Sequence, residues 1–129
     1  MFVDASAIVA MLAQEDDADD LAARLGDAKG PITSSIAIWE AIIALHRAYR
    51  YDLQIASDMV GGLIDGRPIE VVSIGAVEAD LAIAAFSKFG KGRHKANLNM
   101  GDCFAYACAK THGAKLLYKG DDFARTDLA

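Results

Sequence analysis

The sequence has little cysteine, little proline and no long apolar run. Its 129 residues include only two cysteines and two prolines, and no stretch approaches the roughly 20 apolar residues that span a bilayer. Cys103 and Cys108 are five positions apart in an expected helix, so their side chains point about 140° away from each other. We therefore predict no membrane segment, no disulfide and no cysteine zinc site, and we interpret both cysteines as core residues.

A secretion signal and an excess of positive charge are also absent. The opening residues Met1–Asp4 lack the basic stretch and apolar core of a signal peptide, so we expect a cytoplasmic protein. The formal net charge of −5 argues against a general nucleic-acid coat, although a nuclease can combine an acidic metal pocket with a local basic flank. No GxSxG, Walker A or GxGxxG pattern occurs, which leaves serine nucleophiles and phosphate-binding loops without support.

Short apolar segments alternate with helical periodicity in a chain that is 53% hydrophobic. The length favours a single domain, residues 1–129, that buries its own core. Strands are predicted at 2–3, 69–72 and 115–118, and helices at 5–13, from the acidic residues 16–20 onward, from a cap at 33–35 to 49, from 52 onward, at 76–89 and at 100–112. This alternation predicts an α/β fold with a mostly parallel central sheet and helices on both faces. The residues of 76–89 expected to point inward are Val77, Leu81, Ala84 and Ala85.

The densest acidic cluster in the chain receives a structural interpretation. Asp16, Asp17, Asp19 and Asp20 precede Leu21 in the sequence. Carboxylates in a first helical turn complement the helix dipole and cap free N–H groups. We therefore assign no site to this cluster.

Glu40 is the most informative acid in the sequence. Its neighbours one helical turn away are all apolar: Ile36, Ala37, Ile43 and Ala44. A buried ionised carboxylate is costly unless it is paired or bound to a metal. Glu40 is therefore a candidate metal ligand, with a partly exposed position at the edge of an apolar stripe as the alternative.

Three aspartates stand where predicted elements begin or end. Asp4 follows the strand at 2–3, Asp102 is the third residue after the expected helix cap Asn99, and Asp121 follows the last strand. Each has a local alternative, because Asp4 and Asp102 suit helix caps and Asp121 suits a turn. If they meet Glu40 at one edge of the sheet, their mutual repulsion requires a cation. Oxygen ligands select Mg²⁺ or Mn²⁺, which activate water for attack on a phosphodiester.

Four segments carry a resemblance to a known family. The opening Met1–Ser6 resembles the first strand and acid of PIN domains, and Ser35–Glu40 resembles the segment with their second acid. The segments Asn99–Ala107 and Leu116–Phe123 are similar to the corresponding parts of VapC toxins, which belong to VapBC toxin–antitoxin pairs. The resemblance covers the whole chain in order and spacing.

This resemblance implies a PIN fold and a Mg²⁺- or Mn²⁺-dependent endoribonuclease. It also implies a homodimer that acts on RNA, has no membrane association and is inhibited by a cognate VapB-like antitoxin. Ser6 resembles the small polar residue two positions after the first acid, which is expected to hydrogen-bond a ligand carboxylate or water.

The resemblance also implies roles for the acids. Asp4 and Asp102 would be the principal metal ligands, and Glu40 would ligate the metal or orient its water. Asp121 is the expected fourth acid, with the adjacent Asp122 as its rival because some family members space this aspartate differently.

One basic stretch and two other functions complete the expectations. Lys88, Lys91, Arg93, His94 and Lys95 lie shortly before Asp102, either as a flank that holds RNA phosphates or as a solvated loop. A non-catalytic PIN-like module that binds RNA or a partner is the main alternative function. A Mg²⁺-dependent phosphoacceptor domain, with Lys119 as its lysine, is a weaker one because no adjacent acids follow the first strand.

Overall fold

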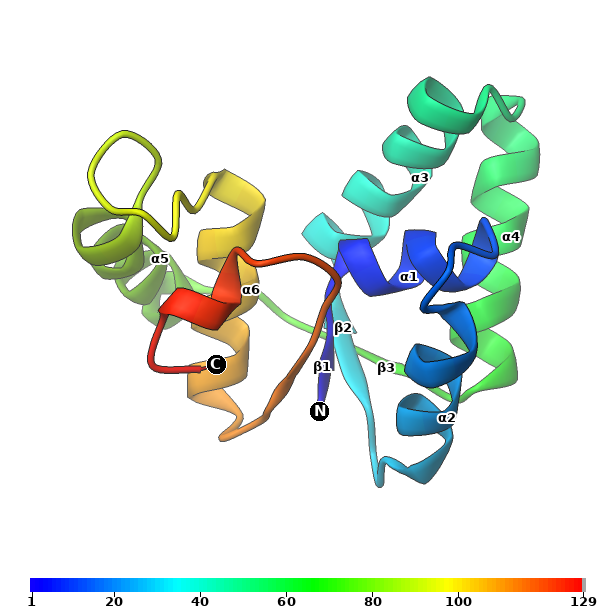
Figure 1. Cartoon of the computed structure of the whole chain (residues 1–129). Coiled ribbons are helices and arrows are strands. Elements are labelled where there is room, and N and C mark those ends of the chain that lie inside the picture. Colours follow the sequence, from blue (N-terminus) through cyan, green and yellow to red (C-terminus); the bar gives the residue numbers. More distant parts are fainter. Residues whose placement is uncertain (129) are drawn as a thin grey trace.

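A computed structural model describes residues 1–128 and shows a four-stranded sheet between two groups of helices (Figure 1). The elements follow in the order β1 (Phe2–Val3), α1 (Ala5–Leu12), α2 (Ala18–Asp27), β2 (Ile32–Ser34), α3 (Ser35–Tyr49), α4 (Leu53–Gly66), β3 (Glu70–Val72), α5 (Ala76–Phe89), α6 (Met100–Thr111), β4 (Leu116–Leu117) and the 3₁₀ helix η1 (Phe123–Arg125). In residues 1–128, no helix is long and apolar enough to cross a membrane.

The sheet is parallel throughout and has the strand order β3-β2-β1-β4. Phe2 of β1 is aligned with Ile32 on one side and with Leu116 on the other. Helices α1 to α4 cover one face, and α5 and α6 cover the other (Figure 1). The strand order reverses between β1 and β4, because β2 and β3 are added on one side of β1 and β4 is added on the other. Crevices at the carboxyl ends of strands on either side of such a point are the usual ligand sites of α/β sheets.

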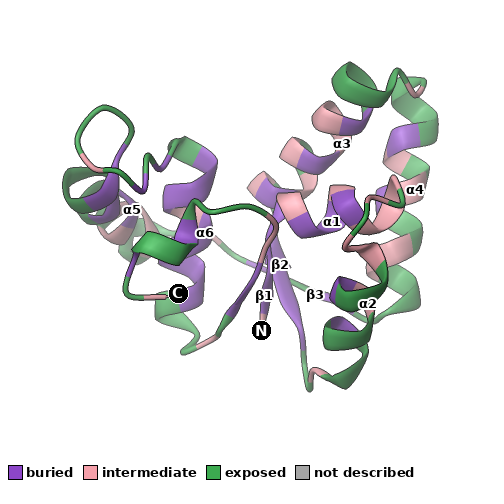
Figure 2. Ribbon diagram, viewed as in Figure 1, coloured by how far each residue is buried: buried purple, intermediate pink, exposed green. Residues whose placement is uncertain are grey.

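Burial follows this layered arrangement. Strands β1, β2 and β4 and the helix faces turned toward the sheet are buried, whereas the outer helix faces and most of the edge strand β3 are exposed (Figure 2). Helix α6 is the most extensively buried helix, since eight of its twelve residues are buried. Cys103 and Cys108 are free thiols on this helix, and burial raises the pKa of each to about 11. Their interpretation as core residues is confirmed.

Strand β2 is the one strand that the sequence did not predict. Only Ile32 is apolar in its three residues, so no period-2 or apolar signal marks it. Thr33 and Ser34 are nevertheless buried, and the Thr33 hydroxyl donates to the Val3 carbonyl oxygen at 2.8 Å. Ser34 also caps α3 by accepting from the Ala37 amide at 3.1 Å. A predicted helix cap thus forms the end of a buried strand.

The inward face of α5 was predicted only in part. Ala85 is buried as expected, but Val77 is 62% exposed and Ala84 is also exposed. The buried stripe instead consists of Ala82, Ala85 and Phe89. The spacing of three and four residues in this stripe is as helical as the predicted one, so periodicity alone did not separate the two faces.

Candidate functional site

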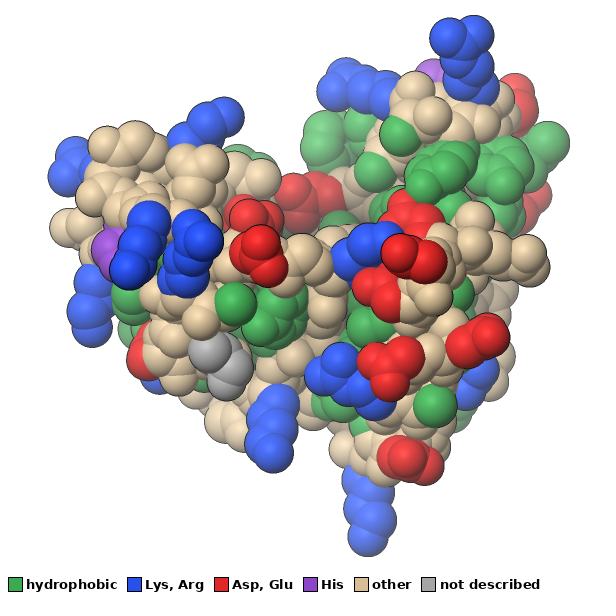
Figure 3. Space-filling view, in the orientation of Figure 1, with side chains coloured by type: hydrophobic (Ala, Val, Ile, Leu, Met, Phe, Trp, Pro, Cys, Tyr) green, Lys and Arg blue, Asp and Glu red, His purple; other side chains and the backbone are tan. Residues whose placement is uncertain are grey.

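A hollow of about 450 Å³ lies at the carboxyl ends of β1 and β4. We call it the acidic hollow, because the charged side chains that line it are Asp4, Glu15, Glu40, Asp102, Lys119 and Asp122. The molecule is visibly hollowed between its two lobes, with acidic side chains at the notch (Figure 3). The topology therefore brings together three of the four acids singled out by the sequence.

Asp4 is held by the start of α1. The residue follows β1, is only 4% exposed and caps α1. Its Oδ2 accepts from the Ser6 amide at 3.0 Å and from the Ser6 hydroxyl at 2.6 Å, which confirms the expected contact with Ser6. The Ser6 hydroxyl in turn accepts from the Lys119 amide at 3.0 Å. Burial raises the pKa of Asp4, against the opposing effect of the Ser6 hydrogen bonds.

Asp102 combines a capping role with a place in the hollow. Its Oδ2 accepts from the Asn99 amide at 3.0 Å, and its own amide donates to the Asn99 side-chain oxygen at 2.9 Å. This capping box opens α6 and fixes the carboxylate at the wall of the hollow. Burial raises the pKa of Asp102 to about 7, with further contributions from the charges of Asp4 and Asp122.

Glu40 reaches the hollow from α3. Its carboxylate lies so close to the backbone of Gly101 that a Cβ at that glycine would sit 1.9 Å from Oε2. Burial raises the pKa of Glu40 to about 7, and the charges of Asp4 and Asp102 add to the effect. Gly101 is therefore part of the site, and sequence reasoning missed it. A glycine in the first turn of a helix, where it lowers helix stability, was the available signal.

The two aspartates that follow β4, Asp121 and Asp122, have different positions. Asp122 lines the hollow, and its charge helps to raise the pKa of both Asp4 and Asp102. Asp121, the acid preferred on sequence grounds, is not among the residues that line the hollow. The chain turns at Gly120, where φ is +94°, and Asp122 is the residue immediately before η1. This turn places the second aspartate, rather than the first, beside the cluster.

Lys119, which lies between β4 and η1, connects that segment to the loop between α1 and α2. Its Nζ lies 2.9 Å from Glu15 Oε1, 3.1 Å from Asp16 Oδ1 and 3.2 Å from Asp17 Oδ1. Glu15 also accepts a hydrogen bond from the Tyr49 hydroxyl at the end of α3. These carboxylates raise the pKa of Lys119. Part of the acidic cluster at 16–20 thus holds a lysine in place. Asp19 and Asp20 lie in the first turn of α2 as predicted, but the predicted capping is wrong for the N-cap residue Asp17, whose side chain makes no capping hydrogen bond.

The donor set of the acidic hollow fits a hard divalent cation. Asp4, Glu40, Asp102 and Asp122 offer only carboxylate oxygens, and three of them have raised pKa values because their charges are poorly solvated and repel one another. Across residues 1–128, no three Asp, Glu, His or Cys side chains are already arranged closely enough to hold a metal ion. Closing the set around a cation therefore requires the carboxylates to draw together.

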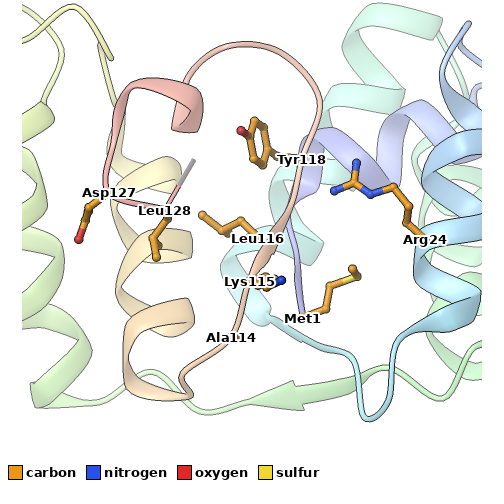
Figure 4. A pocket seen from close by; sticks show the side chains of 8 residues that line it. All are labelled: Met1, Arg24, Ala114, Lys115, Leu116, Tyr118, Asp127 and Leu128. Atoms are coloured by element: carbon orange, nitrogen blue, oxygen red, sulfur yellow. The ribbon is translucent and has the colours of Figure 1, made fainter.

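A second hollow runs along the edge strand β4, from Met1 and Lys115 at the amino ends of β1 and β4 to Tyr118 just past β4 (Figure 4). It has a volume of about 540 Å³, and the residues around it include Met1, Arg24, Lys115 and Tyr118. It shares no lining residue with the acidic hollow, and Asp127 is the one acid that lines it. We call it the amino-end hollow. Its mixed lining contains no cluster of metal-binding oxygens.

Comparison with known proteins decides the family. The PIN domain family matches residues 1–128. The chain is a VapC-type member of the PIN domain family. It is similar to "VapC ribonuclease R02377" of Rhizobium meliloti, with 41% identity over 139 aligned positions that cover 98% of each chain. It is also 36% identical to "VapC ribonuclease Mb0640" of Mycobacterium bovis, over 100% of this chain and 96% of that one.

A solved structure supports the PIN fold. The crystal structure of VapC20 of Mycobacterium tuberculosis, described as a sarcin–ricin-loop-cleaving toxin, superposes with a TM-score of 0.70. The superposition covers 95% of this chain and 92% of VapC20, at 20% sequence identity. The predicted α/β PIN fold with a parallel central sheet is confirmed.

Proposed function

We propose that this protein is a Mg²⁺-dependent endoribonuclease, able to use Mn²⁺, and the toxin of a type II toxin–antitoxin pair. The observation that carries the proposal is that one hollow, at the carboxyl ends of β1 and β4, gathers four acids: Asp4, Glu40, Asp102 and Asp122. The names of its relatives, VapC ribonucleases, supply the reaction class. A non-catalytic PIN-like module would not need four carboxylates in one place, three of them poorly solvated.

Each acid has a proposed role in the site. Asp4 and Asp102 would be the principal cation ligands, since Ser6 and Asn99 already fix their carboxylates. Glu40 would complete the set, and Asp122 replaces Asp121 as the proposed fourth acid. A bound divalent cation supplies positive charge to phosphate oxygens and lowers the pKa of a water molecule.

The protein groups around the cation supply orientation. Burial and the neighbouring carboxylates raise the pKa of Glu40 to about 7 in the cation-free protein, and a bound cation would lower it, so Glu40 would ligate the cation or orient its water in the ionised form. Gly101 leaves the space in which this carboxylate lies. The Ser6 hydroxyl donates a hydrogen bond to Asp4 Oδ2 and so orients that carboxylate in the hollow.

The partners that we propose are RNA, a VapB-like antitoxin and a second copy of the chain. Two exposed apolar surfaces are available for protein partners. One lies on α3 and α4 and includes Trp39 and Leu53, and the other lies on α5 and α6 and includes Ile83 and Met100. Co-expression with the small neighbouring reading frame, followed by chromatography with light scattering, measures both associations.

The test of the activity is cleavage of total RNA by purified protein with EDTA, Mg²⁺ or Mn²⁺, followed by mapping of the new 5′ ends. We expect defined cuts that need a divalent cation and disappear in Asp122→Asn. Asp121→Asn is the matched control, because it makes the same change one residue away and outside the hollow. Equal cleavage with and without EDTA would contradict the proposed function.

A further inference from the structure

The charges around the acidic hollow are unevenly distributed. Between residues 81 and 101 the sequence has no Asp or Glu, whereas it has four cations: Lys88, Lys91, Arg93 and Lys95. On the opposite side, residues 15–20 include five acids and no cation, and Glu15 among them lines the hollow. Figure 3 shows this contrast, with Lys and Arg side chains gathered on the α5–α6 lobe and acidic side chains on the front of the α1–α2 lobe.

The cations on the α5–α6 side are not neutralised by carboxylates. Lys110 pairs with Asp127 and Lys119 pairs with three acids. By contrast, within residues 1–128 no carboxylate lies within salt-bridge distance of the five cations that we call the basic rim: Lys88, Lys91, Arg93, Lys95 and Arg125. Other exposed cations within residues 1–128, such as Lys29, Arg47 and Arg50, also have no carboxylate at that distance. What distinguishes the basic rim is that four of its five cations lie in a stretch, residues 81–101, that has no acid, and this concentration of positive charge favours an external anion.

The basic rim is supported by a defined backbone. Gly90 and Leu98 form a bridge, and the Lys91 amide donates to the Leu98 carbonyl oxygen at 2.8 Å. Arg125 of η1 donates from Nη1 to the Lys95 carbonyl oxygen at 3.1 Å, which joins η1 to this loop. The Arg93 guanidinium lies 5.3 Å from the ring centroid of Phe86, which is 41% exposed. The cations are therefore presented from a built loop.

The rim leads directly to the acidic hollow. The loop ends at Asn99, which lines the hollow and forms the capping box with Asp102. Asp122, at the start of η1, also lines the hollow, and Arg125 follows three residues later. An anionic chain bound to the rim therefore continues past both acids.

We propose that the basic rim binds the phosphates of single-stranded RNA, so that the substrate enters the hollow from the α5–α6 side. This inference rests on the proposed ribonuclease function and assigns the surface that holds its substrate. Lys and Arg contacts to phosphates supply affinity without reading sequence. The five acids at 15–20 outnumber the two cations that pair with them, Lys119 and Arg24, so that side keeps a net negative charge that disfavours phosphates. The Phe86 ring lies under the Arg93 guanidinium and holds it at the rim.

Binding of a fluorescently labelled single-stranded RNA in EDTA tests the rim without cleavage. The variant is Lys91→Gln, Arg93→Gln and Lys95→Gln together. The control is Lys29→Gln, Arg47→Gln and Arg50→Gln together, three exposed cations elsewhere whose loss changes the net charge equally. We expect the rim variant alone to weaken binding. The slope of log affinity against log salt should fall by about 2, since each single-strand phosphate contact contributes roughly 0.7.

Kinetics with Mg²⁺ separate the rim from the catalytic acids. We expect the rim variant to raise KM and to keep kcat. If the triple variant folds poorly, Lys91→Gln alone is measured instead, and we expect it to raise KM by a smaller factor. Equal RNA affinity in the rim and control variants would overturn the inference and leave the ribonuclease proposal standing. Weaker binding to the antitoxin with unchanged RNA affinity would also overturn it. Absence of RNA binding and cleavage by the unmodified protein would instead overturn the proposed function.

Discussion

The acidic hollow and the amino-end hollow, which runs along β4, differ in size and in chemistry. The amino-end hollow is the larger, at about 540 Å³ against about 450 Å³, yet it gathers no cluster of acids. The acidic hollow receives residues that follow β1 and β4, residues from the middle of α3 and residues at the beginning of α6. Strand direction and crossover handedness determine which side chains meet at each end. Chain topology, rather than hollow size, therefore locates the candidate chemistry.

The largest difference between the two hollows should appear when an acid is neutralised in each. We expect Asp102→Asn to reduce RNA cleavage by at least about 1,000-fold, because the cation that it helps to hold supplies several kcal/mol of stabilisation. Asp127→Asn changes the acid of the amino-end hollow and should leave the cleavage rate unchanged. Initial rates with Mg²⁺ measure both. Robust cleavage by purified Asp102→Asn would defeat the assignment.

A smaller but still large effect is expected from Gly101→Ala. The added Cβ would lie 1.9 Å from Glu40 Oε2, so the carboxylate has to leave its place against α6. We expect about a 10–100-fold loss of kcat, the range found when groups that orient metal ligands are changed. Gly113→Ala is the control, because it makes the same change at a glycine just past the end of the same helix. Its positive φ means that alanine there costs stability, but kcat should not change. Equal kcat for Gly101→Ala and the unmodified protein would contradict the role of this glycine.

Lys119→Met should have an intermediate effect. Without the ammonium, Glu15, Asp16 and Asp17 repel one another and release the segment that carries Asp122. We expect about tenfold weaker Mn²⁺ binding by calorimetry and a similar fall in kcat, with recovery in Lys119→Arg. Lys115→Gln, at the amino-end hollow, is the control and should bind Mn²⁺ normally. If methionine and arginine at position 119 behave alike, the charge of Lys119 does not position the site.

The smallest expected effect is on stability. In the ion-free protein the pKa of both Glu40 and Asp102 is raised to about 7. The folded state therefore holds more protons than the unfolded state between about pH 4 and 7, and stability falls as the pH rises through that interval. We expect a lower Tm at pH 8 than at pH 5.5 with EDTA, and a smaller difference with Mg²⁺. Glu40→Gln should raise the Tm at pH 8 in EDTA, and a decrease would contradict the unfavourable charge at this position.

The sequence predicted most of the architecture because local signals mark most elements. The segment 76–89 has the predicted bounds, and the capping box of Asn99 and Asp102 is where the sequence placed it. Strand β2 was missed because Thr33 and Ser34 are polar, and their burial depends on neighbours such as Val3, 30 residues away in the sequence. Val77 and Ala84 were assigned to the wrong face because apolar residues occur all around α5.

The candidate site was predictable in its acids but not in its details. Asp4, Glu40 and Asp102 stand out locally, and the structure brings them together. The choice between Asp121 and Asp122 depends on the turn at Gly120, whose φ of +94° leaves no trace in the spacing. The proximity of Gly101 to Glu40 joins two helices that are far apart in the sequence. Such contacts are properties of the tertiary fold.

The pairing of β1 with β4 has a consequence for how the protein is made. Phe2 and Val3 align with Leu116 and Leu117, more than a hundred residues later, and Asp122 comes later still. During translation Asp4 therefore has no neighbouring strand β4 and no closing acid until the ribosome has passed this point. A growing chain leaves the ribosome in order, so the acidic hollow is complete only after β4 and Asp122 have emerged. Nascent chains that stop before Asp122 lack one of its four carboxylates.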